Sequence, residues 1–478
     1  MRSYTIYHKH HLRLKLYQLI VNIHGIKLKQ GCTMNKLRIL KQYLKTKYGL
    51  RFSNRKQLEQ FHKRQIEKQL LFTIEASPFY RQLYKPFLHE IEKGNLSALP
   101  IIDKEVMMEH FDTLNTVHIS KKEAFHVAFE AEKTRNFTPT IRNITVGLSS
   151  GTSGNRGVFL VSEEEQTLWA GSIIGKVLPS SILHKHTIAF FLRANSNLYE
   201  ATKNKRISFH FFDLLDSFQQ HITRLNEVKP SILIAPPSML RKIAYWQQEG
   251  LITICPKKII SVAEVLEDID RDFISATFQQ TVHQVYQCTE GFLATTCKQG
   301  TLHMNEDLVH IEKEYLDQEK GIFVPIITDF MRKTQPIIRY RLNDILIEKK
   351  TPCSCSSPFL ALERIDGRCD DIFIGISEVG HSEIFIFPDF IRRAILFASS
   401  DIQEFKVIQH SVDKIEIKLK ALPENLELCQ SKVMQELHTL WSTKKCAIPH
   451  FFFSHYDIQV YDKKLKRIES FVRRGEHK

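Results

Sequence analysis

The stretch Leu148-Ser149-Ser150-Gly151-Thr152-Ser153-Gly154-Asn155-Arg156-Gly157-Val158-Phe159 decides how the rest of this chain is interpreted. Between Ser149 and Gly157 it holds three glycines, four hydroxyl side chains and one arginine. Backbone N–H groups in such a loop can curl around phosphate oxygens, and hydroxyls and a cation bind the same charge. No lysine follows the last glycine, so this is not a Walker A loop. We interpret it as a loop that binds a nucleoside triphosphate.

Seven residues of the loop are candidate phosphate ligands: Ser149, Ser150, Gly151, Thr152, Ser153, Gly154 and Arg156. Glycine-rich turns are common between strands, so the loop alone does not establish a nucleotide site. The interpretation depends on the motifs that follow it in the chain.

Length and composition limit the class of protein. A chain of 478 residues with 43% hydrophobic residues should form two or three globular domains. The formal charge of +14 lies entirely in residues 1–75, which hold 17 Lys and Arg against 3 Asp and Glu. The rest of the chain is neutral, so we expect a basic N-terminal extension over residues 1–53 with a solvated helical face. We do not expect a nucleic-acid partner.

The cellular location is also suggested by the sequence. No apolar run reaches the ~20 residues that cross a bilayer, and no small-residue cleavage pattern follows the apolar segment 16–26. Nine cysteines in a long chain fit reduced thiols or a metal site better than a disulfide framework. We therefore expect no membrane span and a cytoplasmic location.

Hydrophobic spacing predicts a large domain over residues 54–366. A helix is expected from Asn54 to Glu75 and another over 104–111, with Asp103 as its N-cap. Beyond the loop, strands are expected over 187–192, 231–235, 258–262 and 282–286, and helices over 216–228, 238–248 and 269–279. This alternation predicts parallel strands covered by helices on both faces, an α/β fold.

A second, smaller domain is expected over residues 367–478. Its pattern is a strand region over 374–387, a helix, a strand region over 405–419, a helix over 431–440 and a short strand near Ile458. About 100 residues of this kind form an independent α+β unit.

Four short motifs follow the loop in a fixed order. They are Ser261-Val262-Ala263-Glu264, Tyr286-Gln287-Cys288-Thr289-Glu290-Gly291, Ile338-Arg339-Tyr340-Arg341-Leu342-Asn343-Asp344 and Gly367-Arg368-Cys369-Asp370-Asp371. In this order the five segments resemble the adenylate-forming superfamily of acyl-CoA synthetases. The resemblance is greatest to the branch with phenylacetate-CoA ligase and coenzyme F390 synthetase. It extends from about Leu58 to the end of the chain.

This resemblance implies a large adenylate-forming domain and a small mobile α+β lid. It implies ATP-dependent activation of a small-molecule carboxylic acid to an acyl-adenylate, release of pyrophosphate, and acyl transfer, by default to coenzyme A. ATP and Mg²⁺ would be required. The alternatives left open are a nucleotidyltransferase that leaves AMP on its substrate and a non-catalytic nucleotide-binding scaffold with a basic arm. A homodimer is also left open.

The resemblance also implies a role for individual residues. Thr289 would bind the α-phosphate or the acyl carboxylate, and Glu290 would bind Mg²⁺, since hard carboxylate oxygen suits that ion. The remaining nucleotide contacts would come from Ala263, Glu264, Tyr286 beside the adenine, Asp344 at the ribose hydroxyls and Arg368 at ribose or phosphate. Asp370 would be the hinge of the small domain.

The catalytic lysine of this superfamily lies near the C-terminus in a Gly-Lys-x-x-Arg pattern. Here Lys463-Lys464-Leu465-Lys466-Arg467 fits if Lys463 replaces the glycine, which assigns the role to Lys464 and leaves Lys463 and Lys466 as alternatives. An ammonium at this place would neutralise charge that develops when a carboxylate attacks the α-phosphate.

A second constellation is Cys297 and His303, followed fifty residues later by Cys353 and Cys355. Three thiolates and an imidazole suit a tetrahedral zinc ion, so we expect a structural Zn²⁺ site. Similar Cys/His placements occur in relatives of phenylacetate-CoA ligase.

Two departures from the family pattern affect the predicted function. The usual Pro-Lys after the phosphate loop is missing, so phosphate binding would depend on Arg156. The segment between Asp371 and Phe387 is longer than usual and lacks the usual glycine. Since this region faces the acceptor in thioester-forming relatives, adenylation is better supported than transfer to coenzyme A.

Overall fold

Five neighbouring parallel strands form one half of a large sheet. The computed structural model describes residues 30–136, 138–149, 156–192, 206–380, 382–399, 401–456 and 466–472. The strands are β4 (His186–Leu192), β5 (Ile207–Asp213), β6 (Ile232–Ala235), β7 (Lys258–Ser261) and β8 (Val282–Gln287), in the order β8-β7-β6-β4-β5. The helices between them are α11 (Phe218–Val228), α12 (Pro237–Gln248) and α13 (Asp268–Phe278). The predicted helix and strand alternation is therefore confirmed, and β5 is an edge strand that the sequence analysis did not assign.

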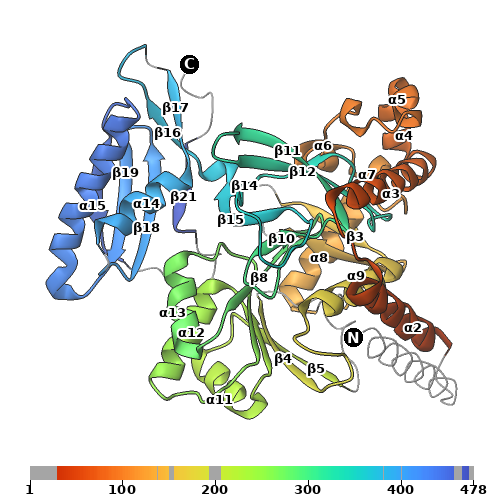
Figure 1. Cartoon of the computed structure of the whole chain (residues 1–478), viewed down its shortest axis with the longest axis horizontal. Coiled ribbons are helices and arrows are strands. Elements are labelled where there is room, and N and C mark those ends of the chain that lie inside the picture. The colour runs from red at the N-terminus through yellow and green to blue at the C-terminus, as the bar shows by residue number, and fades with distance from the viewer. Residues whose placement is uncertain are drawn as a thin grey trace, which may run out of the picture.

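Alternate side chains of these strands enter two separate cores, as a sheet covered on both faces requires. Phe191 of β4 packs with Leu225 of α11 on one face. Its neighbour Phe190 lies on the other face with Ile174 of α9 (Glu163–Val177). Figure 1 shows this covered half in green and yellow, apart from the small blue domain.

The described part of the expected N-terminal extension, residues 30–53, packs on the large domain. Helix α2 (Gln30–Leu44) packs along α9, and Tyr43 is only 2% exposed in the core that they share. The Gln42 amide donates to Ser172 Oγ at 2.9 Å, and a Cβ at Gly171 would lie 2.6 Å from Gln42 Cβ. Only a glycine allows the two helices to approach so closely.

The other half of the large sheet is antiparallel, and the sequence analysis assigned no strands to it. Its strands run in the order β11-β12-β14-β15-β10-β9, and β9 joins β8. They are β9 (Phe292–Thr296), β10 (Leu302–Met304), β11 (Val309–Asp317), β12 (Ile322–Asp329), β13 (Tyr340–Arg341, paired with β12), β14 (Asp344–Glu348) and β15 (Ala361–Arg368). All eight residues of β12 are buried, so its sequence shows no alternation.

Helices near the N-terminus cover this antiparallel half. They are α3 (Arg55–Ala76), α4 (Pro78–Tyr84), α5 (Leu88–Glu92), α6 (Lys104–Glu109) and α7 (Phe111–Leu114). Helix α8 (Lys121–Thr134) follows them and packs on a separate small sheet. Asn54 caps α3 by accepting from the Gln57 amide at 3.0 Å, and Asp103 caps α6 by accepting from Val106 at 3.0 Å. The cap at Asp103 matches the sequence prediction, and Asn54 caps the helix that the sequence predicts to begin there. A three-stranded sheet of β1 (Thr140–Ile141), β2 (Ile144–Leu148) and β3 (Val158–Val161) packs on α8.

The small domain is an α+β unit, as predicted. Its elements are β16 (Phe373–Ile376), β17 (Glu383–Ile386), α14 (Pro388–Ala398), β18 (Glu404–Ser411), β19 (Lys414–Lys420), α15 (Pro423–Thr443), β20 (His450–Ser454) and β21 (Ile468–Ser470). Its own core surrounds the fully buried Trp441. The strand expected near Ile458 falls outside the described residues, and a strand precedes it at β20. The predicted α/β fold class is confirmed. Among the described helices none is both long and apolar enough to cross a membrane.

Candidate active site

The phosphate-loop motif begins and ends on neighbouring strands. Ser149 follows β2, Gly157 precedes β3, and these strands pair in antiparallel register. The Ser149 N–H donates to the Gly157 carbonyl at 2.8 Å, and the Gly157 N–H donates to Ser149 Oγ at 2.7 Å. These two bonds close the base of the loop. The candidate ligands Ser150, Gly151, Thr152, Ser153 and Gly154 lie outside the described residues.

Arg156, the predicted cation of the loop, has another partner in this structure. Both its terminal nitrogens bind the Glu132 carboxylate of α8, at 2.6 and 2.7 Å. The hydrogen bond from Arg156 lowers the pKa of Glu132, so this carboxylate is ionised at neutral pH. The pair fixes the end of the loop to α8 and balances the charge of Arg156.

A small cavity of about 10 Å³ lies beside the base of the loop, and it contains residues from two of the predicted motifs. Its lining includes Ser149, Gly157, Thr289, Glu290, Arg332 and Lys104. The sequence analysis found the helix that Lys104 begins but assigned no role to the lysine, because a single cation at a helix start forms no motif. Thr289 and Glu290 therefore lie beside Ser149 and Gly157, the residues at the base of the loop.

Lys104 brings a positive charge to this cavity. A Cβ at Gly157 would lie 3.1 Å from Lys104 Cε, so the glycine leaves room for the lysine side chain. Burial lowers the pKa of Lys104, and Glu290, Arg368 and Asp370 all act on its charge. The usual lysine after the phosphate loop is missing, and Lys104 can supply a cation to the same place.

Three further predicted residues, Tyr286, Asp344 and Arg368, lie together near the ends of their strands in the large sheet. Asp344 at the start of β14 pairs in register with Arg368 at the end of β15, and Arg368 Nε lies 3.6 Å from Asp344 Oδ1. The Tyr286 hydroxyl donates a hydrogen bond to Asp344. Burial raises the pKa of Tyr286 well above its usual value, so the hydroxyl keeps its proton. An aromatic ring, a carboxylate and a guanidinium are thus adjacent, as a nucleoside site requires.

A tyrosine of the motif 338–344 forms a hydrogen bond with Glu290. The Tyr340 hydroxyl donates to Glu290 Oε1 at 3.2 Å. Burial raises the pKa of the neighbouring Cys288 thiol, so this cysteine is no candidate nucleophile. The Cβ that an alanine would place at Gly291 would lie 2.8 Å from Asp329 Oδ2, so the turn after Glu290 needs a glycine.

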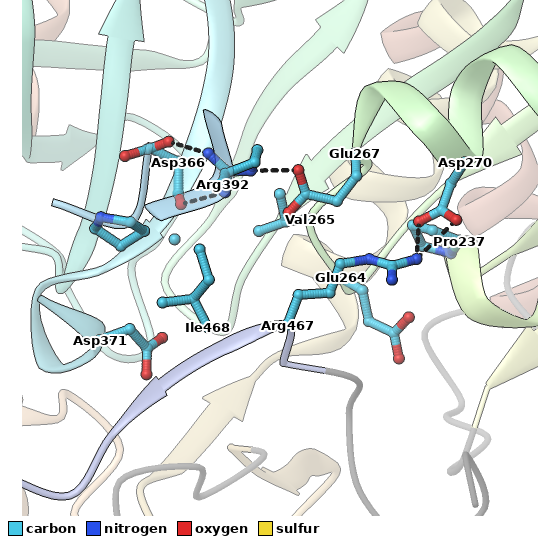
Figure 2. A pocket seen from close by; sticks show the side chains of 12 residues that line it. Pro237, Glu264, Val265, Glu267, Asp270, Asp366, Asp371, Arg392, Arg467 and Ile468 are labelled. Atoms are coloured by element: carbon cyan, nitrogen blue, oxygen red, sulfur yellow. Dashed lines mark hydrogen bonds and ion pairs between the residues drawn. The ribbon is translucent and has the colours of Figure 1, made fainter. Parts of the chain in front are cut away.

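Glu264 lies in a second cavity, between the two domains. Ala263 has a φ of 68°, and the Glu264 carboxylate accepts from the Ser238 N–H at 3.3 Å. Glu264 also lines a cavity of about 50 Å³ together with residues of the small domain (Figure 2). The structure therefore does not bring Glu264 into the cavity that holds Thr289 and Glu290.

The junction of the two domains contains the predicted hinge. Asp370 is exposed in a short 3₁₀ turn between β15 and β16, and it accepts from the Asn343 amide at 2.6 Å. Lys466, one of the three candidate lysines, binds the buried carboxylate of Asp371 at 2.8 Å. Lys464 and Lys463 lie outside the described residues, so the assignment to Lys464 stays a prediction.

The predicted zinc ligands lie close together where β9 ends and β10 begins. The ligand atoms of Cys297, His303, Cys353 and Cys355 all lie within 4.8 Å of one another. Cys297 Sγ is 3.8 Å from Cys353 Sγ, and Cys355 Sγ is 3.4 Å from His303 Nε2. Tetrahedral zinc with Zn–S of about 2.3 Å and Zn–N of about 2.0 Å requires separations of about 3.8 and about 3.5 Å. The four side chains therefore fit a zinc ion.

The histidine of this cluster is also oriented for a metal. His303 Nδ1 lies 3.2 Å from the Phe359 carbonyl, to which it can donate a hydrogen bond. This arrangement leaves Nε2 unprotonated and directed at the sulfur atoms, as metal-binding histidines require. The cluster lies apart from the cavity with Glu290, which favours a structural role.

Comparisons with known proteins agree with this architecture. The 2-hydroxyisobutyryl-CoA ligase in its postadenylation state superposes with a TM-score of 0.63 at 15% identity, over 86% of this chain and 89% of that one. The GH3.15 acyl acid amido synthetase gives 0.55 at 12% identity, over 87% and 92%. The chain therefore shares its fold with these two enzymes. At these identities the likeness concerns the fold alone.

The 2-hydroxyisobutyryl-CoA ligase in its thioesterification state gives a TM-score of 0.50 over 87% of this chain, against 0.63 in its postadenylation state.

Two curated proteins match part of the sequence. "Protein CapK" of Staphylococcus aureus is 27% identical over 208 residues, 43% of this chain and 45% of its own length. The indoleacetate–lysine synthetase of Pseudomonas savastanoi is 26% identical over 233 residues, 45% and 56%. The match thus spans about half the length of these curated relatives. No family model matches the chain.

Proposed function

We propose that this protein activates a carboxylic acid with ATP to an acyl-adenylate and then transfers the acyl group to an acceptor. The observation that carries the proposal is the grouping of separate motifs on adjoining strand ends. Tyr286, Asp344 and Arg368 are in contact, while Thr289 and Glu290 share a cavity with the base of the phosphate loop. The adenylate-forming fold supports the same conclusion.

The roles follow from the chemistry of these groups. A carboxylate oxygen of the acid attacks the α-phosphorus, a new O–P bond forms, and pyrophosphate leaves. Both reactants are anions, so cations at the α-phosphate lower the barrier. Lys104 supplies one from α6, and Lys464 would supply another from the small domain. Asp344 accepts the ribose hydroxyls, and Thr289 donates to the phosphate.

Glu290 is the proposed Mg²⁺ ligand. Its carboxylate lines the cavity beside the phosphate loop, and hard oxygen donors suit this ion. The hydrogen bond from Tyr340 orients one carboxylate oxygen. Bound Mg²⁺ would neutralise phosphate charge there.

The acceptor is proposed to be coenzyme A, with an amine as the second candidate. Coenzyme A follows from the likeness to the 2-hydroxyisobutyryl-CoA ligase. The amine is favoured by the sequence match to an indoleacetate–lysine synthetase, whose name states transfer to lysine. The β16–β17 hairpin occupies the segment that departs from the pattern of thioester-forming relatives, so adenylation is better supported than transfer to coenzyme A.

The proposal is tested by ATP–pyrophosphate exchange with a panel of aryl, fatty and short hydroxy acids. We expect exchange with at least one class of acid and its loss in Asp344→Ala, with Lys406→Gln on the small domain as the matched control. Absence of exchange with every acid, in protein shown to bind ATP, would contradict the proposal. With an active acid, mass spectrometry of products made with coenzyme A or with lysine then identifies the acceptor.

The Cys/His cluster is proposed to hold a structural Zn²⁺. Its four ligands come from the β9–β10 turn region and from the loop between β14 and β15. The ion would cross-link the β9–β10 region to the loop between β14 and β15.

A further inference from the structure

A group of buried charges joins the two domains beside the hinge. Arg392 of α14 forms ion pairs with Glu267 at the start of α13 and with Asp366, the latter at 2.7 Å. Arg467, just before β21, binds Asp270 in the first turn of α13 with one nitrogen at 2.8 and 2.7 Å from the two carboxylate oxygens. Figure 2 shows both arginines reaching from the small domain to acidic residues of the large domain.

A third arginine completes this group from the large domain. Arg241 of α12 binds Asp270 at 3.0 Å and donates to the backbone carbonyl of Gln403 in the small domain at 2.9 Å. Asp270 thus accepts hydrogen bonds from one arginine of each domain. We call Arg241, Glu267, Asp270, Arg392 and Arg467 the interdomain clasp.

The clasp is almost completely removed from solvent. The side chains of Arg392 and Glu267 are 7% and 6% exposed, and those of Arg467 and Asp270 are 4% and 1% exposed. Burial works against the charge of each arginine, but the facing carboxylates raise the pKa of both Arg392 and Arg467. Removing one partner of such a pair leaves a buried charge without compensation, so the clasp opposes separation of the domains unless water enters.

Water has a route to these charges. The cavity of about 50 Å³ between the domains is lined by Asp366, Arg392 and Arg467, and it is large enough for ordered water. Asp366 Oδ2 and Arg467 Nη1 are buried and have no hydrogen-bond partner among the described residues. The cavity therefore leaves room for water beside buried polar atoms that the direct ion pairs do not satisfy.

We propose that Glu267 and Asp270 are positioning residues of the adenylation step. Through Arg392 and Arg467 they hold the small domain against the nucleotide site, in the arrangement that this structure has. Neither residue touches the reacting atoms. Only the first half-reaction depends on this orientation, so loss of the clasp slows adenylation and spares acyl transfer. The kinetic part of this inference rests on the proposed function.

The first test measures domain orientation in the full chain without any ligand. Asp270→Asn keeps the shape of the side chain and removes the charge that binds Arg467. We expect a larger radius of gyration in small-angle X-ray scattering and roughly tenfold or more faster hydrogen exchange in the segment 466–472. Lys406→Gln is the matched control, because the Lys406–Glu469 pair at 2.8 Å lies within the small domain.

A second variant covers the case in which Asp270→Asn does not fold. Glu267→Gln removes one of the two large-domain carboxylates that pair with Arg392 and leaves the other, Asp366. The same opening is expected. Wild-type scattering and exchange in the folded variants would overturn the proposal, and this result does not depend on any substrate.

The second test uses the half-reactions, once an acid that supports exchange is known. We expect Glu267→Gln and Asp270→Asn to slow ATP–pyrophosphate exchange on the order of 10²-fold, as misplaced reacting groups do. Transfer from chemically synthesised acyl-adenylate to the acceptor should keep its wild-type rate. Equal slowing of both half-reactions would overturn the positioning role. If wild-type protein shows no exchange, the proposed function fails, and scattering still decides whether the clasp exists.

Discussion

Removal of metal from the Cys/His cluster should destabilise the large domain by a calculable amount. Cys297 and Cys353 are separated by 56 positions in the sequence, so a metal that binds both closes a loop of this length. The loop-closure relation used for covalent cross-links gives about 4 kcal/mol at 25 °C for such a loop. For a domain of this size this corresponds to a fall in Tm of roughly 6 °C.

The assay combines metal analysis with calorimetry. Protein produced with zinc present should contain one zinc ion per chain, and a strong chelator should lower the Tm of the large domain. Cys355→Ser should lose the zinc and show the lower Tm without chelator. The control is Cys255→Ser, which changes an exposed cysteine outside the cluster.

A protein without zinc would contradict the proposed metal site. A disulfide is no substitute in this structure, because 3.8 Å between the sulfur atoms of Cys297 and Cys353 is far longer than an S–S bond of about 2.05 Å. If the full-length protein binds no zinc, and chelation leaves the Tm unchanged, the four side chains do not form a metal site.

Three further predictions concern single side chains. Lys104→Gln should slow adenylation on the order of 10²-fold in ATP–pyrophosphate exchange, because it removes a cation at the phosphates, and an unchanged rate would exclude that role. Tyr286→Phe should lower the free energy of unfolding by about 1–2 kcal/mol in urea titration, since Asp344 loses a buried hydrogen-bond donor, and an unchanged midpoint would contradict the contact. Burial raises the pKa of Asp329 to about 6 from 3.8, so the folded state binds more protons than the unfolded state between these values. Stability should therefore fall by about 3 kcal/mol as pH rises through this window. Urea titration of Asp329→Asn against wild type across this pH range should show the slope removed, and parallel curves would contradict the assignment.

The parallel half of the sheet could be predicted because its sequence alternates two clear patterns. Each short apolar run is followed by an amphipathic segment, and the resulting strands and helices appear within a few residues of their expected bounds. The predicted strand over 282–286 also ends at Tyr286, which is at the carboxyl edge of the sheet where ligands of α/β folds bind. Local pattern was sufficient for both conclusions.

The antiparallel half was beyond that reasoning. β12 is buried along its whole length and contains Pro325, so it shows neither alternation nor an uninterrupted β-branched run. Its burial depends on α3 and α4, which come from more than 200 residues earlier in the chain. No local window contains that information.

Long-range pairing also decided the details of the site. Arg156 binds Glu132, which lies 24 positions earlier on another element, so the loop sequence could not reveal its partner. Lys104 reaches the site from the start of α6, and nothing in its immediate sequence marks it. The packing of residues 30–53 on the large domain could not be predicted from net charge. The basic residues on the surface of α2 dominate that count, although Tyr43 of the same helix is buried.

The close packing of α2 on α9 has a practical consequence for anyone who shortens this chain. The net charge of the chain changes near residue 54, and Asn54 is also the N-cap of α3. A fragment that begins there would therefore seem to start at a domain boundary. It would also strip the cover from Ala170 and Ile174 of α9, which are almost fully inaccessible in the intact chain. The exposed apolar surface would promote aggregation. Low solubility of such a fragment would then result from the truncation and not from the intact protein.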